Sequence, residues 1–307
     1  MRLKTELHHW WPRNLSRFWA GDDGCTTQFS HDGEIVRAPP ANFGAITNAH
    51  HIKFQDDNPW NTSFESTFGK ADRQFGDLAE WLMKRETKQA GPRAVFHDRL
   101  LAQTLPPKRR RQLSECLASL IVRSPGSRNN IRMTVEYYRQ RFGMKNFQAD
   151  KSIIAANMRS CYDVFVRVID AAGKFLVLIT DAQEFICGDG FLHNFPSSGD
   201  RPLNPRCVVP LLPTITVLFV SPLIFRTHPE LMTLRLGKEE VVFFNNIVQI
   251  YSRDHIFYRN DKPKIIDQFG EREFFQFEYH QEEWLDGLIE AAVTFGPGLS
   301  HRRAYRV

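Results

Sequence analysis

The clearest hydrophobic pattern lies between Phe64 and Lys88, where apolar residues recur at steps of three, four and seven positions. This spacing places them along one face and predicts an amphipathic helix that contributes to the core. Turn-forming residues occupy Asp56 to Asn61, just before this helix. Thr62 and Glu65 then have the spacing of a capping box, so we expect the helix to begin at residue 62 or 63.

Similar spacing predicts further helices, which fill most of the N-terminal half and recur in the C-terminal half. They cover Arg93 to Leu105, Pro107 to Val122, Asn129 to Phe142, residues 151–171, Val241 to Arg253 and Trp284 to Phe295.

Short apolar runs predict strands. Lys174 to Thr180 and Ile215 to Val220 are typical of buried strands, and Thr27 to Arg37 alternates around Asp32-Gly33, which predicts a hairpin with a type I′ turn. The expected fold class is α+β. A mostly helical N-terminal half packs around a small mixed β-sheet formed largely by the C-terminal half, with an N-terminal β-hairpin.

The chain is long enough to bury a large core. It has 307 residues, of which 42% are hydrophobic and 12% aromatic, and its 25 phenylalanines fit a packed interior. We find no internal repeat and no low-complexity linker. We therefore expect a single domain over residues 1–307, or two intertwined subdomains, with 1–150 mainly helical and 151–307 mixed α/β.

Cysteine usage and hydropathy favour a cytoplasmic protein with no membrane partner. The five cysteines include no C-x-x-C pair, and their odd number argues against a complete disulfide framework. We expect no signal peptide, because no charged region followed by an apolar segment opens the chain. The longest apolar run, Val208 to Phe225, is interrupted by prolines and predicts strands joined by turns. The pattern specifies no oligomeric state.

The charge balance leans toward an anionic partner such as nucleic acid or a nucleotide. The net charge is +5 and the isoelectric point is near 9.0. The one dense basic run, Lys108 to Arg111, would either contact phosphate or form the solvated first turn of a helix.

Two histidine doublets carry candidate chemistry. His8 and His9 are adjacent, so they lack the i, i+4 spacing of a helical zinc site. Pro12 favours an extended lead-in that delivers one imidazole inward. Either one histidine is buried and hydrogen-bonded while the other is solvated, or one imidazole is functional. His50-His51, together with His31, would form a metal site only if the fold brought them together.

Other polar residues lie near the ends of predicted elements. Asp181 follows a buried strand, where it would either face a crevice or cap the loop. Arg123 and Arg128 flank a break between two helices, where a guanidinium would clamp phosphate or pair internally with an acidic residue. Asn246 and Arg253 are seven positions apart on a predicted helix, which favours a shared polar face and a hydrogen-bond network.

The chain lacks three common enzyme signatures. It has no G-x-S-x-G elbow, no G-x-x-x-x-G-K-[ST] phosphate loop and no G-x-G-x-x-G fingerprint, which disfavours serine hydrolases, P-loop nucleotidases and Rossmann dehydrogenases. Gly188-Asp189-Gly190 offers one flexible turn and is too short to identify a motif.

Four segments, taken in order, resemble one known family. They are HHWWPRNLSRF from His8 to Phe18, RSPGSR from Arg123 to Arg128, LITDAQEF from Leu178 to Phe185 with PLNP from Pro202 to Pro205, and FNNIVQIYSR from Phe244 to Arg253. Together they span most of the chain and resemble the family known as domain of unknown function 4238.

The third of these segments departs from the family pattern. Members tend to carry a serine-aspartate-asparagine-proline run there, whereas this chain has Thr180, Asp181 and then Ala182-Gln183, and Asn204 replaces a usual serine. The departures weaken the case for a catalytic role of that turn. The resemblance implies a bacterial or phage-related soluble protein with no established reaction, in a family sometimes suspected of a part in host–phage conflict.

Two hypotheses follow from these residues. In the first, the protein is an enzyme that cuts or modifies nucleic acid or nucleotides, most simply a hydrolase, with His8 or His9 as general acid or base and Arg123 or Arg128 stabilising phosphate charge. Asp181 would orient the base or hold a divalent cation; the sequence leaves open whether a metal is used, with Mg²⁺ and Mn²⁺ as the candidates. The residues expected to bind the substrate are Arg128, Asn246 and Arg253. This hypothesis requires the catalytic side chains to meet in one cleft.

In the second hypothesis, the protein is a non-catalytic binding or sensor protein whose polar residues fix helix junctions. It predicts that Arg123→Ala lowers the melting temperature or the solubility and leaves activity close to that of the wild type.

Overall fold

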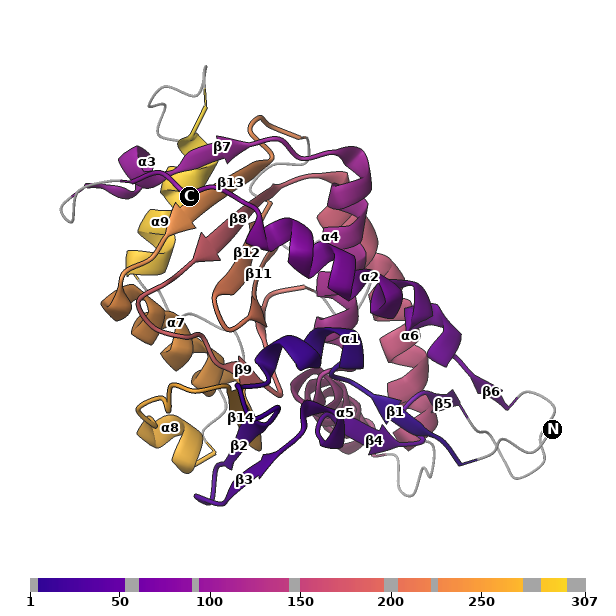
Figure 1. The fold of residues 1–307 in the computed structure, drawn as a ribbon. Helices are drawn as coiled ribbons and strands as arrows, with labels where there is room; N and C mark the ends of the chain where they lie inside the picture. The colour runs from indigo at the N-terminus through magenta and orange to yellow at the C-terminus, as the bar shows by residue number, and fades with distance from the viewer. Residues whose placement is uncertain are drawn as a thin grey trace.

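The computed structural model describes residues 5–52, 61–89, 94–143, 150–195, 204–221, 226–272 and 283–296. The fold is mixed α/β and contains a six-stranded sheet (Figure 1). Its strands are β7 (Leu101–Gln103), β8 (Lys174–Ile179), β10 (Leu192–His193), β11 (Arg206–Leu212), β12 (Ile215–Val220) and β13 (Leu231–Arg235). The strand order is β10-β11-β12-β8-β13-β7, in which β8 and β13 are parallel and the other neighbours are antiparallel.

The helices surround this sheet and pack on one another. They are α1 (Arg13–Ser16), α2 (Glu65–Met83), α3 (Phe96–Arg99), α4 (Pro107–Arg123), α5 (Pro125–Arg141), α6 (Asp150–Ala171), α7 (Lys238–Tyr251), α8 (Asp267–Gly270) and α9 (Glu283–Thr294), with 3₁₀ turns η1 (Arg17–Trp19) and η2 (Pro40–Asn42). Helix α4 contacts both α2 and α6, which Figure 1 shows on one side of the sheet. Among the described residues, no helix is long and apolar enough to cross a bilayer.

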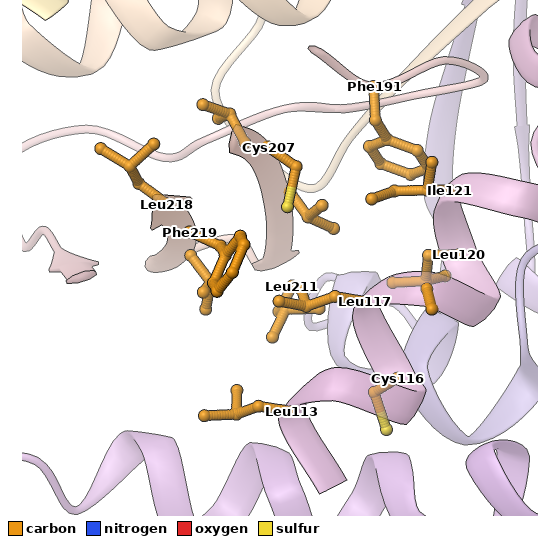
Figure 2. Packing of buried hydrophobic residues seen from close by; sticks show 14 of the residues in the cluster. Leu113, Cys116, Leu117, Leu120, Ile121, Phe191, Cys207, Leu211, Leu218 and Phe219 are labelled. Carbon is orange, nitrogen blue, oxygen red and sulfur yellow. The ribbon is translucent and has the colours of Figure 1, made fainter. Parts of the chain in front are cut away.

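The core lies between the sheet and its helices. Every residue of β12 is buried, which is typical of a strand covered on both faces and explains its continuous apolar sequence. Figure 2 shows the apolar side of α4, with Leu113 and Leu117, facing Leu211 of β11 and Phe219 of β12. The same hydrophobic cluster contains residues from both halves of the chain, from Trp10 to Ala292.

A second sheet joins distant parts of the chain. It consists of β3 (Ile35–Ala38), β2 (Thr26–Ser30), β14 (His255–Tyr258) and β9 (Cys187–Gly188), in that order. Two small antiparallel pairs lie outside both sheets, namely β1 (Leu7–His9) with β4 (Ala45–Thr47), and β5 (His51–Ile52) with β6 (Thr62–Ser63). These two pairs carry both histidine doublets.

Three local predictions were wrong, namely the start of α2, the helix over residues 93–105 and the turn type of the hairpin. Helix α2 begins at Glu65, because Thr62 and Ser63 pair with β5 and leave the capping-box spacing unused. The segment predicted as a helix over 93–105 forms only the short α3 and then β7, because its residues 101–103 pair with β13.

The predicted β2–β3 hairpin is present, but its turn type differs. The Gly33 N–H donates to Ser30 and the Ser30 N–H donates to Glu34, at 2.9 Å each. This is a type I turn followed by a bulge, with the positive φ of +91° at Gly33. Asp32 is not among the described residues with positive φ, so it lacks the conformation that a type I′ turn requires.

The basic run Lys108 to Arg111 is largely paired inside the protein. Arg110 is 1% exposed, donates to carbonyls of residues 169, 170 and 173 at the C-terminal end of α6, and pairs with Glu230 at 2.9 Å. Arg109 pairs with Asp77, and Arg111 pairs with Glu115. Arg110 therefore compensates the negative end of α6, a role that neither sequence interpretation anticipated.

The turn after β9 connects three parts of the fold, and we call it the Asp189 junction. Asp189 is 1% exposed, and its carboxylate accepts the backbone N–H groups of residues 253–255 at 2.6, 2.9 and 3.2 Å. Its carbonyl accepts the N–H of Gly126 in α5 at 2.9 Å. At Gly190 a Cβ atom would collide with the Tyr251 carbonyl, so only glycine fits there.

A candidate histidine and glutamate site

Three histidines and two glutamates from separate parts of the chain meet beside the N-terminus of α2. His8 lies on β1 opposite Ile46, and His51 lies on β5 opposite Ser63. His50 directly precedes β5. We call the set Glu6, His8, His50, His51 and Glu65 the His–Glu cluster. The exposed fractions of His8, His50 and His51 are only 2%, 1% and 4%.

Glu6 accepts hydrogen bonds from two imidazoles. Its Oε2 lies 3.1 Å from His8 Nε2 and 3.0 Å from His51 Nε2. The two rings are inclined at 74°, so their edges converge on this one oxygen. The hydrogen bonds from His51 and His8 lower the pKa of Glu6, which keeps it ionised.

The tautomer of neutral His8 follows from a backbone contact. The N–H of His50 donates to His8 Nδ1 at 2.9 Å, so Nδ1 carries a lone pair. The proton of the neutral ring is therefore on Nε2, which donates to Glu6. The His8 and His50 rings also stack, with centroids 4.7 Å apart and planes 13° apart.

His50 forms a pair with Glu65 of the kind found in catalytic dyads. His50 Nδ1 contacts Glu65 Oε2, and no described residue bonds the His50 Nε2. Burial lowers the pKa of His50 more than the Glu65 carboxylate raises it. Burial raises the pKa of Glu65, but the hydrogen bond and charge of His50, with Arg123, lower it further. At neutral pH the pair is thus a carboxylate that orients a neutral imidazole with a free lone pair.

Both arginines of the RSPGSR segment fix the backbone beside a histidine. Arg123 is fully buried and pairs with both oxygens of Asp72, at 2.6 and 3.1 Å. It also donates to the carbonyl of His9 at 3.1 Å. Arg128 donates to the carbonyl of Ala49, directly before His50, at 2.9 Å. The expected internal ion pair of Arg123 is present, and it leaves this guanidinium unable to touch a substrate.

Arg128 differs from Arg123 in its electrostatic balance. It also touches the Met158 sulfur, at 3.0 Å, and it has no carboxylate partner within the described chain. Burial alone lowers the pKa of Arg128. A desolvated cation without a counter-charge favours an anion close by.

The geometry of the cluster does not suit a metal ion. A ligand imidazole keeps its lone pair toward the metal and its N–H on the other nitrogen. His8 has the reverse arrangement toward Glu6, because its Nδ1 accepts the His50 N–H. The ligand atoms of His8, His50 and Glu65 lie within 4.8 Å of one another, but the two imidazole planes are stacked at 13°, which disfavours an ion in the plane of both rings. Mg²⁺ would moreover prefer an all-oxygen site.

The sequence-predicted catalytic residues meet only in part. His8, the carbonyl of His9 and Arg123 lie together, but Asp181 does not join them. Asp181 is exposed at the end of β8 and pairs with Arg235 at 2.6 Å. Figure 1 places this end of β8 away from β1. Thr180 caps the loop, because its hydroxyl accepts the Ala182 N–H at 3.1 Å. Asp181 therefore pairs with Arg235 away from the cluster, and the single-cleft expectation is wrong for Asp181.

The other predicted residues have different surroundings. Asn246 lies on α7 with no hydrogen bond among the described residues, while its neighbour Asn245 bridges the backbone of residues 184 and 186 at 3.0 Å. Arg253 lies beyond the end of α7, so the shared helix face is wrong, and it donates to Asn129 at 2.8 Å. His31 lies in the β2–β3 turn, where its N–H donates to Asp254, outside the cluster.

Residues 202 and 203 of the PLNP segment and residues 56–60 of the predicted turn lie outside the described part of the chain. Neither Glu6 nor Asp72 was among the residues predicted from the sequence, and Glu65 was expected only to cap a helix. Two features of the sequence could have indicated the cluster. They are the second doublet, His50-His51, and the acidic residues Glu65 and Asp72, which lie two turns apart at the start of α2.

Comparisons with protein-family models, with curated proteins and with solved structures find no match to this chain.

Proposed function

We propose that this protein is a hydrolase of phosphodiesters in nucleic acid or nucleotides, in which His50 acts as general base. The observation that carries the proposal is the His50–Glu65 pair, which leaves the imidazole neutral with Nε2 unbonded among the described residues. His50 Nε2 would take a proton from the attacking water, while Glu65 stabilises the imidazolium that forms. This role replaces the one expected for His8 or His9.

Charge near the pair supports an anionic substrate. Arg128 holds the backbone before His50 and has no carboxylate partner within the described chain. Its guanidinium has donors left for a phosphate oxygen. Arg123 is a positioning residue, because Asp72 and the His9 carbonyl use its donors. We also propose, from the resemblance to domain of unknown function 4238, that the protein takes part in phage defence.

A second candidate is a non-catalytic binding or sensor protein, as the burial of the cluster suggests. His8 and His50 are only 2% and 1% exposed, and buried hydrogen-bonded histidines are commonly structural. In this case the cluster stabilises the junction between α2 and the two small strand pairs. The two candidates differ in what loss of the His50 base does to activity.

The test incubates the purified protein with single- and double-stranded DNA and RNA and with nucleotides, in EDTA, Mg²⁺ or Mn²⁺. We expect cleavage that resists EDTA and falls by about 10²- to 10⁴-fold in His50→Gln, the usual contribution of a general base. Glu65→Gln should lower the rate as well, with a pH optimum shifted relative to the wild type.

Two folded controls separate activity from stability. His31→Gln changes a histidine outside the cluster, and Asp181→Asn changes the exposed aspartate at the end of β8; both should cleave at the wild-type rate. Cleavage by His50→Gln at the rate of His31→Gln would reject the base. Activity that EDTA abolishes and one metal restores would also reject it, and a folded wild type inactive on every substrate would favour the binding protein.

A further inference from the structure

A cavity of about 460 Å³ lies between α2, α4 and α6, apart from the His–Glu cluster. Its walls include Lys70 from α2, Arg111 and Glu115 from α4, and Tyr162 and Arg167 from α6. Its volume is in the range of sites for small organic ligands. None of the residues that line it belongs to the cluster, so the two sites are distinct.

One wall of the cavity is fixed by a buried carboxylate. Glu115 is 4% exposed and accepts from Lys70 Nζ at 2.7 Å, Arg111 Nε at 2.7 Å and Gln74 Nε2 at 3.1 Å. The pKa of Glu115 is raised by burial but lowered further by these donors, so it is ionised. These donors offset the charge of Glu115. Lys70 and Arg111 each keep N–H groups that Glu115 does not use, although one N–H of Arg111 donates to Asp170 at 3.3 Å.

Two further groups on α6 have unused donors. Tyr162 is 7% exposed and lines the cavity, yet its hydroxyl has no hydrogen-bond partner within the described part of the chain. Burial and the charge of Glu115 raise the pKa of Tyr162, so the hydroxyl stays protonated and can donate. Arg167 is exposed, donates Nε to the Asp163 carbonyl at 3.2 Å, and has no carboxylate partner within the described chain.

Together these groups favour a negatively charged ligand. The lining has three cations, of which Lys70 and Arg111 already pair with Glu115 and Arg111 also pairs with Asp170 at 3.3 Å, so Arg167 is the cation with no carboxylate partner within the described chain. The Asp163 carboxylate lies beside the cations and has no ion pair among the residues that the structure describes, so it suits the hydroxyl groups of a sugar as acceptor. We infer that the cavity binds a phosphorylated sugar, with the phosphate on Arg167, Lys70 and Tyr162 and the sugar hydroxyls on Asp163.

Calorimetric titration of the full chain with ribose 5-phosphate, AMP, inorganic phosphate and adenosine tests this inference. We expect ribose 5-phosphate and AMP to bind, inorganic phosphate to bind more weakly, and adenosine not to bind. Higher salt should weaken binding because the contacts are charged. Adenosine binding as tightly as AMP, or no binding of either sugar phosphate at millimolar concentration, would overturn the inference.

Point variants locate the site. Arg167→Ala should weaken binding of ribose 5-phosphate by about tenfold or more, and Tyr162→Phe, which removes only the hydroxyl, by about threefold to tenfold. Arg159→Ala changes an exposed arginine two turns earlier on α6, outside the lining, and should bind normally. Equal affinity of Arg167→Ala and Arg159→Ala would place the ligand elsewhere. The result is independent of hydrolysis, because His50→Gln should bind the sugar phosphate as the wild type does.

Discussion

The His–Glu cluster and the Asp189 junction both contain buried polar side chains, but their polar groups find hydrogen-bond partners to different degrees. In the junction, both oxygens of Asp189 accept backbone N–H groups, and glycines allow the surrounding backbone to close on it. In the cluster, His51 Nδ1 is buried without a partner, and His50 Nε2 has none among the described residues. Complete satisfaction is typical of a structural connection, whereas a retained lone pair is available for chemistry.

The largest effect is expected from removing the centre of the junction. Asp189→Ala leaves three partly buried backbone N–H groups without their acceptor, and a fully buried group of this kind costs about 1–3 kcal/mol. The free energy of unfolding should fall by about 3 kcal/mol or more, measured by chemical denaturation. A variant as stable as the wild type would show that the hydrogen bonds of Asp189 do not stabilise the fold, which would contradict a structural role for the junction.

The next effect concerns the Arg123–Asp72 ion pair, which lies beside the His–Glu cluster. Arg123→Met leaves Asp72 without its buried partner and should lower the free energy of unfolding by about 3 kcal/mol. Asp72→Asn in the same chain should recover part of this loss, because the remaining side chain is then neutral. A double-mutant cycle measures the coupling, and strictly additive effects would show that the ion pair does not hold β1.

The sequence predicted the role of Arg123 only as one of two alternatives. RSPGSR correctly indicated a helix break, and an internal ion pair for Arg123 was one of two interpretations. Its partner, Asp72, is 51 positions away, and no local pattern specifies such a pairing. By contrast, β12 was predicted with its observed bounds, because a fully buried strand is a continuous apolar run.

The candidate site was less predictable than the fold for the same reason. His8 meets His50 through the β1–β4 and β5–β6 pairs, which are two or three residues long and have no hydrophobic alternation. Short strands of this kind depend on tertiary contacts and leave little pattern in the sequence. Asp181 was placed correctly at a strand end, but the partner that the fold supplies there is Arg235.

Acidification should act on the two regions with opposite signs. In the folded protein the pKa of His50 lies below 6.5 and that of Glu65 lies below 4.5. The contribution of each group to stability is therefore fully present at neutral pH. It is lost as the pH falls from these ordinary values through the lower pKa of the folded protein. Burial raises the pKa of Asp189 from 3.8 to about 7, so its contribution is fully present below about pH 4 and is lost as the pH rises through about 7.

Stability measured from pH 4 to pH 8 in variants tests these signs. Relative to the wild type, His50→Gln with Glu65→Gln should lose less stability on acidification, and Asp189→Asn should lose less on going from pH 4 to pH 8. Identical pH profiles of the three proteins would show that neither region titrates as proposed.

The smallest effect is expected at Asp181, where sequence analysis placed a catalytic group. Its side chain is 68% exposed and its partner Arg235 is 44% exposed, so solvent screens the ion pair. Asp181→Ala should change the free energy of unfolding by less than about 0.5 kcal/mol and leave cleavage at the wild-type rate. A large loss of activity in this folded variant would mean that the end of β8 takes part in chemistry. In that case an exposed carboxylate, and not the lone pair of buried His50, would carry the general-base role, and the unsatisfied groups of the His–Glu cluster would have no catalytic meaning.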